Sequence, residues 1–365
     1  MTLPYQRITT LPFFPLNEPP THLPDGTPTR RLNLNESPFP PAPSVVAAMT
    51  EAAMNAHRYG DGEAVALVDA LAAHTGAARA RVFVGAGSNE LLAAVADIAL
   101  APGDHMIAPD PAFPTYAKNA GVRDASFTGI PVTPDGRPDI DAMLAAVTPR
   151  TRLMVVSSPH NPTGGLLSED EVTRLCTDLP EHVMLHFDEA YYEFGQAAGG
   201  PDTLPILARR TGPWISTRTF SKAYALAGAR IGYGIASSPE VALAMRKVRA
   251  NFGLTAMAQA AALAALAAKD HSAMIVDHAI RGGAALADRL TALGFTPLPA
   301  AANFLATRCP IPAKSLCDQL AEAGILTGTF QMNGETLLRI TIGTDEDMAA
   351  VTREIEAILA RTSPA

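Results

Sequence analysis

The sequence predicts an α/β fold in which a large domain, with a mainly parallel sheet flanked by helices, is joined to a smaller α+β domain. Two observations carry this prediction. From residue 46 to residue 250, short β-branched runs alternate with helical patterns, and after residue 250 that alternation stops. Strands that alternate with helices are joined by right-handed crossovers and therefore run parallel. We expect residues 1–45 to form an extended N-terminal arm, residues 46–250 the large cofactor-binding domain and residues 251–365 the small C-terminal domain.

The arm is rich in proline, as in PFFPLNEPP and SPFPPAPS, which favours an extended chain. The strands expected in the large domain lie at residues 81–90, 105–113, 152–165, 182–194, 214–222 and 229–236. Each run ends in a polar or glycine-rich turn, and a helical pattern follows. Because ligands bind beyond the carboxyl ends of the strands in such sheets, these turns form the candidate site.

The small domain is expected to begin with Ala-rich helices. One of them, AMAQAAALAALAA (256–268), is Ala-dominated and short, which is typical of a packed helix rather than a membrane span. Strands are expected at residues 302–309, 324–330 and 335–344, before a final helix over residues 345–361. The mixture of helices and short strands predicts an α+β unit.

The composition is that of a globular protein, with 48% hydrophobic and 18% charged residues. The net charge of -8 argues against nucleic acid as a partner, and the absence of a basic run argues against a membrane surface. The three cysteines have no CxxC spacing, and the N-terminus lacks the pattern of a secretory signal. We therefore expect a cytoplasmic protein without a metal site.

Four polar segments follow the expected strands, and each has an ordinary structural explanation when taken alone. In GAGSNELL, Ser88 or Asn89 is suited to cap a helix in a tight turn. In SSPHNPTGG, Asn161 precedes a proline and fits a turn. In HFDEAYYEF, Asp188 is suited to cap a helix, and in TRTFSKAYALAGAR, Lys222 fits a solvated lysine.

Together the four segments supply a phosphate cradle, a buried carboxylate, hydrogen-bonding Asn161 and Tyr191, and the single amine Lys222. A pyridine cofactor that bears a phosphate needs this set of groups. The carboxylate keeps the ring nitrogen protonated, and the amine bonds to the aldehyde and then carries a proton. Arg230 and nearby hydroxyls neutralise the phosphate.

The segments NPTG, DEAYYEF and SKAYALAGARIGY resemble the signature segments of fold-type I pyridoxal-phosphate-dependent aminotransferases. The pattern is most similar to the histidinol-phosphate aminotransferase family. Further matches are LNLNESPF, HRYGDGE, GAGSNELL, DPAFPTY, ANFLATR and LLRITIGT. They keep the family's order from about residue 32 to the C-terminus.

The resemblance implies pyridoxal 5'-phosphate as cofactor and a homodimer with shared active sites. It assigns catalysis to Lys222 as the Schiff-base lysine, to Asp188 at the pyridine nitrogen and to Tyr191 at the phenolic oxygen. The other cofactor ligands that it implies are Ser88, Asn89, Phe113, Asn161, Thr219, Ser221 and Arg230, with Tyr59 reaching the phosphate of the neighbouring subunit. Arg339 is implied to hold the substrate carboxylate, and Asn35 lies in the arm that closes over the substrate.

The implied reaction moves an amino group between histidinol phosphate or an aromatic amino acid and a 2-oxo acid such as 2-oxoglutarate. The chain departs from the family where the substrate is expected: Phe113 replaces a tyrosine, the arm lacks a tyrosine, and ANFGLTAM replaces a segment that commonly resembles PFNVN. The amino donor therefore stays open. Arg30, Arg31 and Arg249 are candidate ligands of a substrate phosphate, with solvated arginines as the alternative.

Two rival functions remain at this point. The same fold supports decarboxylases and carbon–sulfur lyases, and Arg339 alone does not tell whether a substrate carboxylate is retained. A non-catalytic ligand sensor fused to a DNA-binding module is the other alternative. The segment before residue 45 shows neither a helix-turn-helix pattern nor a basic run, which disfavours the sensor.

Overall fold

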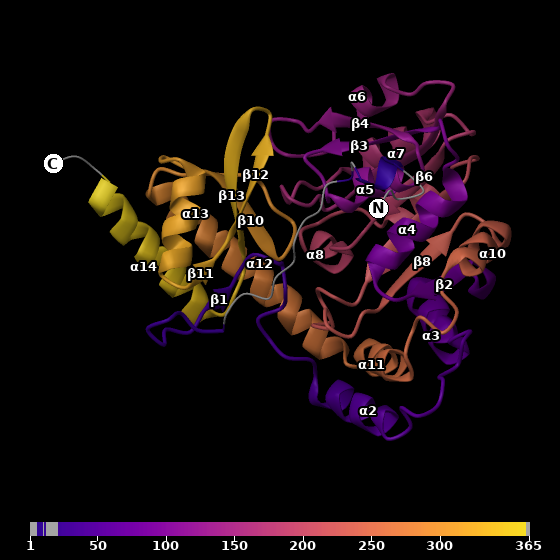
Figure 1. Ribbon diagram of the computed structural model, residues 1–365, viewed down its shortest axis with the longest axis horizontal. Helices are drawn as coiled ribbons and strands as arrows, with labels where there is room; N and C mark the ends of the chain where they lie inside the picture. Colours follow the sequence, from indigo (N-terminus) through magenta and orange to yellow (C-terminus); the bar gives the residue numbers. More distant parts are fainter. Residues whose placement is uncertain (1–5, 10, 12–20, 363–365) are drawn as a thin grey trace.

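The computed structural model describes residues 6–9, 11 and 21–362 (Figure 1). The PFFPLNEPP part of the arm lies outside the described residues. A short helix, α1, covers Gln6–Thr9. In the rest of the arm, strand β1 (Arg30–Arg31) pairs in parallel with β11 (Ile325–Leu326), so the arm is attached to the C-terminal part of the chain.

Within residues 21–362, the large sheet has seven strands in the order β2-β8-β7-β6-β5-β3-β4. Their bounds are β2 (Val82–Gly85), β8 (Gly232–Ala236), β7 (Trp214–Thr219), β6 (Met184–Asp188), β5 (Thr151–Ser157), β3 (His105–Asp110) and β4 (Ser126–Pro131). Only β8 runs against its neighbours β7 and β2. The expected mainly parallel sheet is therefore confirmed, while the edge strand β4, with its Ser, Gly and Pro, was not predicted.

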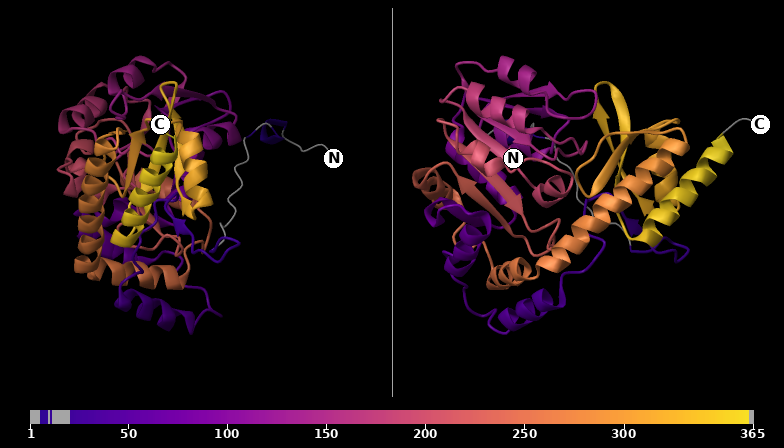
Figure 2. Two further views of the ribbon diagram at one scale, coloured as in Figure 1. Left: turned by 90° about the vertical axis from the view of Figure 1, so that its left-hand side faces the viewer. Right: turned by 180° about the vertical axis from the view of Figure 1, so that it is seen from behind.

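Helices cover both faces of this sheet (Figures 1 and 2). One apolar core lies under α4 (Ser88–Ala99), α5 (Thr115–Val122) and α10 (Pro239–Val248). The other core receives α2 (Pro43–Ala53), α3 (Val65–Thr75), α6 (Ile140–Ala145), α7 (Glu169–Asp178), α8 (Tyr192–Ala197), α9 (Thr203–Leu207) and α11 (Ala256–Ala267). A 3-10 turn, η1, covers Arg79–Arg81 before β2. The central strands are almost wholly buried, as expected for a parallel sheet covered on both faces.

The smaller sheet is antiparallel, in the order β12-β13-β10-β9. Its strands are β12 (Gly328–Met332), β13 (Glu335–Thr341), β10 (Phe304–Arg308) and β9 (Thr296–Pro297). Helices α12 (Lys269–Ala292), α13 (Ala313–Glu322) and α14 (Asp345–Thr362) pack around it. The long helix α12 runs from beside α11 to this sheet and joins the two parts of the molecule (Figure 2).

The buried alanines of α11 join the core of the large sheet, and the core of the small sheet takes up α12 only from Leu286 onward. The predicted domain boundaries after residues 45 and 250 stay a prediction. Helix α11 lies after the second boundary but packs in the core of the large sheet. None of the helices in the described part of the chain has both the length and the apolar character needed to cross a bilayer. The same residues hold no cluster of His, Cys, Asp and Glu suited to a metal ion.

Candidate active site

A cavity of about 640 Å³ opens where the carboxyl ends of the parallel strands face the small sheet and the arm. All the predicted site residues except Tyr59 line it. They are Asn35, Ser88, Asn89, Phe113, Asn161, Asp188, Tyr191, Thr219, Ser221, Lys222, Arg230 and Arg339. Residues from three separate parts of the chain therefore meet in one cavity, as the strand-end argument predicts.

Lys222 follows strand β7 and extends its amine into this cavity. Its Nζ donates hydrogen bonds to the carbonyl oxygens of Leu34, at 3.0 Å, and Asn35, at 2.8 Å. Burial lowers the pKa of Lys222 to about 8, and the positive charges of Arg339 and Arg230 act in the same direction. A lysine with this pKa has a much larger neutral, nucleophilic fraction near neutral pH than an ordinary lysine.

Asp188 ends strand β6 and is buried beside Tyr116. The Tyr116 hydroxyl donates to Asp188 Oδ2 at 2.7 Å, and the Ala190 backbone N–H donates to Oδ1 at 3.1 Å. Burial raises the pKa of Asp188 to about 6, and the two hydrogen bonds oppose that rise. Tyr116 was not predicted as a site residue, although it lies three residues after Phe113, at the start of α5, with its ring edge-on to the Phe113 ring.

The start of helix α4 forms an anion cradle. Gly87 precedes the helix with a φ of 83°, and a side chain there would collide with the Arg230 guanidinium. A Cβ on Gly232 would lie 2.6 Å from the Ser88 nitrogen. No described side chain caps the helix at Gly87, so its first N–H groups and its positive dipole end face the cavity. These features fit a phosphate group.

Two hydroxyls complete the cradle. The Thr219 hydroxyl donates to Ser221 Oγ at 2.9 Å and also accepts the Ser221 backbone N–H. Arg230 adopts a left-handed backbone conformation with a φ of 58°, and its Nη1 donates to the Ala227 carbonyl at 2.8 Å. The sequence grouped these residues with Lys222, and the structure places them in the same cavity.

Arg339, on strand β13, lines the cavity from the side of the small sheet. Its Nη1 donates to Asn161 Oδ1 and its Nη2 to the Asn33 carbonyl, both at 2.7 Å. Its Nε is buried and has no hydrogen-bond partner among the described residues. The guanidinium also lies over the Phe304 ring, 5.5 Å from the centroid. An unpaired donor on a fixed guanidinium matches the forked geometry that binds a carboxylate.

Asn35, in the arm, forms hydrogen bonds with residues beside the large sheet and beside the small sheet. Its Nδ2 donates to the Tyr191 hydroxyl at 2.8 Å, and its carbonyl accepts from Lys222. Thr341 binds both its backbone N–H and its Oδ1, and Asn303 donates to its carbonyl at 3.0 Å. Asn35 is thus a fixed, buried residue that contacts two of the predicted catalytic groups.

Comparison with known proteins agrees with this geometry. The model of the family "Aminotransferase class I and II" matches residues 29–355. The chain belongs to this aminotransferase family. It is 40% identical over 317 residues to an aromatic amino acid aminotransferase of Rhodococcus opacus, covering 87% of each chain. It is 33% identical over 328 residues to histidinol-phosphate aminotransferase 1 of Mesorhizobium japonicum, covering 88% of this chain and 89% of that protein.

A solved histidinol-phosphate aminotransferase from Sinorhizobium meliloti, in complex with pyridoxal-5'-phosphate, superimposes with a TM-score of 0.88. It is 30% identical and covers 98% of both chains. The predicted family and the predicted α/β fold are therefore confirmed, and so is the expectation of an enzyme. The names of these relatives state two different substrates, so the comparisons do not identify the amino donor of this chain.

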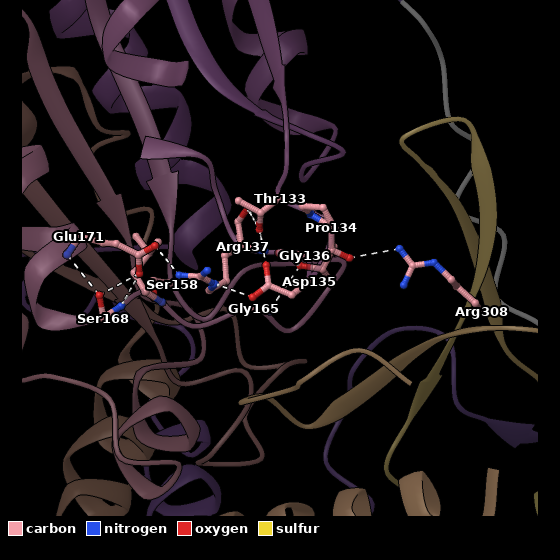
Figure 3. A network of polar contacts seen from close by, with 12 residues as sticks. Thr133, Pro134, Asp135, Gly136, Arg137, Ser158, Gly165, Ser168, Glu171 and Arg308 are labelled. Atoms are coloured by element: carbon pink, nitrogen blue, oxygen red, sulfur yellow. Dashed lines mark hydrogen bonds and ion pairs between the residues drawn. The ribbon is translucent and has the colours of Figure 1, made fainter. Parts of the chain in front are cut away.

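The turn that carries Asn161 in this aminotransferase is supported by contacts outside the cavity. Thr163 donates to the Gly136 carbonyl, and Arg137 pairs with Glu171 of α7. From the small sheet, Arg308 Nη2 donates to the Pro134 carbonyl at 3.1 Å (Figure 3). The segment after β4, which supports the Asn161 turn through Gly136, therefore also contacts the small sheet through Pro134.

Two histidines near the aminotransferase site have structural partners. His160 contacts Ser157 Oγ at 2.6 Å and the Pro111 carbonyl at 2.7 Å, and burial lowers its pKa to about 4. His186 contacts Thr217 Oγ1 at 2.9 Å, and burial lowers its pKa to about 3. Both are neutral near pH 7, consistent with the expectation that neither is the general base.

Tyr59 lies outside the cavity and is 83% exposed. Its ring stacks on the exposed ring of Phe252, with centroids 4.6 Å apart. Within one chain it contacts none of the cradle residues described above. Its role at a neighbouring subunit stays a prediction.

Proposed function

We propose that this chain is a pyridoxal-phosphate-dependent aminotransferase that moves an amino group between an amino acid or amine and a 2-oxo acid. The observation that carries the proposal is the placement of Lys222, with its pKa of about 8, in one cavity with Asp188, an anion cradle and Arg339. A rival decarboxylase or carbon–sulfur lyase would use the same groups, so the reaction products decide between them.

Each end of the cavity has groups suited to one part of the cofactor. Ser88, Asn89, Thr219, Ser221 and Arg230 would hold the phosphate. Asp188 would pair with the pyridine nitrogen, Phe113 would cover the ring, and Tyr191 and Asn161 would bind the phenolic oxygen. When bound, pyridoxal phosphate supplies an aldehyde that takes up the amino group and a ring that draws electrons from the substrate's α-carbon.

The protein's own residues would then perform the remaining steps. Lys222 Nζ would take up the proton released from the substrate's α-carbon and hold it beside the transferred nitrogen. A pKa of about 8 suits both uptake and return of that proton. Arg339 fixes the carboxylate so that the α-carbon faces Lys222. Tyr191 would hold the phenolic oxygen of the cofactor in place, and Asn35 fixes the Tyr191 hydroxyl by donating a hydrogen bond to it.

We further infer a cytoplasmic homodimer with shared sites. The support for shared sites is the exposed Tyr59–Phe252 pair, an apolar surface that a second subunit would cover. The support for a cytoplasmic location is the three cysteines that stand free in the structure.

The test is a half-reaction with purified enzyme and cofactor. Adding an amino donor should shift the visible absorbance of the bound cofactor, and a 2-oxo acid should restore it. Lys222→Ala should abolish the visible band and turnover, whereas Lys247→Ala, on the exposed face of α10, should change neither. Release of CO₂ or of stoichiometric amine without any need for a 2-oxo acid would favour the lyase rival.

A further inference from the structure

The charges around the cavity bear on its substrate. Among the described residues, the cations that line it are Lys222, Arg230 and Arg339. Lys222 and Arg230 belong to the cofactor end, so Arg339 is the cation left for a substrate. The carboxylate of Glu36 also lines the cavity and adds negative charge on the same side as Lys222.

The arginines that the sequence offered for a substrate phosphate are engaged elsewhere. Arg30 pairs with Asp347 at 2.5 Å and with Glu346 at 2.9 Å. Arg31 pairs with Glu36 at 3.2 Å. Arg249 donates to backbone carbonyls in the β2 and 60–62 segments, and none of the three lines the cavity.

A single guanidinium matches a carboxylate better than a phosphate monoester. A carboxylate carries one negative charge, whereas a phosphate monoester carries about 1.5 to 2 near pH 7. Arg339 already gives one N–H of each terminal nitrogen to Asn161 and Asn33, and its Nε donor remains unpaired. A phosphate there would leave excess negative charge in a partly apolar site, at a free-energy cost that a carboxylate avoids.

The strand beside Arg339 leaves room for an uncharged group. Gly328 of β12 lies directly opposite Arg339 of β13 in the antiparallel register. A Cβ on Gly328 would meet only the Arg339 guanidinium, at the ordinary contact distance of 3.8 Å, so a side chain fits there and its absence widens the cavity. Phe330, Leu34 and Phe113 supply apolar surface around this space.

We propose that the amino donor is an α-amino acid with a large uncharged side chain, an aromatic one above all, and that Gly328 is the residue that sets this specificity. The carboxylate binds Arg339 and the side chain lies over Gly328 and Phe330, whereas amines that carry a phosphate are rejected. This inference rests on the proposed function, because it names the substrate of the same site.

The first experiment compares donors in the half-reaction of the wild-type holoenzyme. Phenylalanine should convert the cofactor with a second-order rate constant about a hundredfold above that of histidinol phosphate, as expected when a buried charge lacks its partner. Equal constants, or a preference for histidinol phosphate, would overturn the inference and leave the proposed function standing. Failure of every donor would instead contradict the proposed function.

A binding measurement makes the test independent of turnover. Calorimetry should show that phenylpropanoate binds the holoenzyme about tenfold more tightly than phenylpropyl phosphate, which has the same ring and number of carbon atoms but ends in a phosphate. Tighter binding of the phosphate would overturn the inference, including the case in which the partner subunit of a dimer supplies a cation.

A pair of variants tests Gly328 itself. Gly328→Arg adds a second cation opposite Arg339 and should tighten binding of phenylpropyl phosphate about tenfold while weakening phenylpropanoate. Gly328→Met adds similar bulk without charge and should weaken both ligands. If Gly328→Met tightens phosphate binding as much as Gly328→Arg does, charge at this position does not set the specificity. If Gly328→Arg fails to fold, the wild-type affinities decide.

Discussion

The two ends of the cavity are built in different ways. At the cofactor end, Ser88, Asp188 and Lys222 each lie at or just beyond the end of a strand of the mainly parallel sheet, and each belongs to a short continuous segment. At the substrate end, Arg339 of the small sheet is held by Asn161 of the large domain and Asn33 of the arm. The cofactor end depends on local chain geometry, whereas the substrate end exists only when three parts of the chain meet.

Because the two ends are built differently, substitutions at each end are expected to have different effects. Altering a strand-end residue should affect the cofactor and therefore every substrate. Altering Arg339 of the small sheet should change substrate binding and leave cofactor retention intact.

Asp188→Asn should give the largest loss. Asparagine keeps the shape but cannot hold a proton on a pyridine nitrogen, so kcat should fall by about 10²- to 10³-fold for every donor. Steady-state rates with several donors measure this. Asp178→Asn, at the exposed end of α7, is the control and should retain wild-type rates. A loss confined to one donor would show that Asp188 belongs to the substrate end.

The rate at which the cofactor-free protein captures the aldehyde should follow the pKa of Lys222. Only the neutral amine attacks, and its pKa of about 8 lies below the ordinary value, so lowering the pH protonates it and slows capture. Between pH 6 and pH 8 the rate should rise about fiftyfold and then level off, whereas an ordinary lysine would continue to gain up to about pH 10.4. Stopped-flow absorbance records the profile.

The same profile tests whether the two ends are electrostatically separate. Arg339 is one of the charges that lower the Lys222 pKa. Arg339→Met should therefore move the midpoint to higher pH without removing the plateau. A midpoint that stays in place would mean that burial alone sets the pKa of the lysine.

Arg339→Lys should impair substrate binding. Lysine keeps the charge but loses the fork, so KM for an amino acid donor should rise about thirtyfold while cofactor retention is unchanged. The control is Arg281→Lys on the exposed side of α12, which should leave KM unaltered. Loss of cofactor from Arg339→Lys on gel filtration would contradict the separation of the two ends.

The same contrast explains what could be predicted from sequence. The strand–turn–helix order places polar turns at one edge of a parallel sheet, so Asp188, Lys222 and the cradle could be predicted from their segments. Tyr116 could not, because helix α5 returns its hydroxyl to a strand end far along the chain. Gly328 was also missed, since its position depends on the register between β12 and β13. Strand β4 lacks the β-branched run that identifies the other strands.

Tyr116→Phe should give the smallest effect. It tests whether a residue of helix α5, away from the strand ends, also contributes to cofactor binding. The Tyr116 hydroxyl donates to Asp188 and holds the pKa of that carboxyl below the value that burial alone would set. Without this bond the pKa of Asp188 should rise above about 6. As the pH falls, the Asp188 carboxylate that binds a protonated pyridine ring would then be protonated at a higher pH than in the wild type. Cofactor affinity, titrated by fluorescence, should weaken about three- to tenfold near pH 6 and much less near pH 8. KM for the donor should not change. A uniform loss at all pH values would instead indicate that Tyr116 acts only through packing against Phe113.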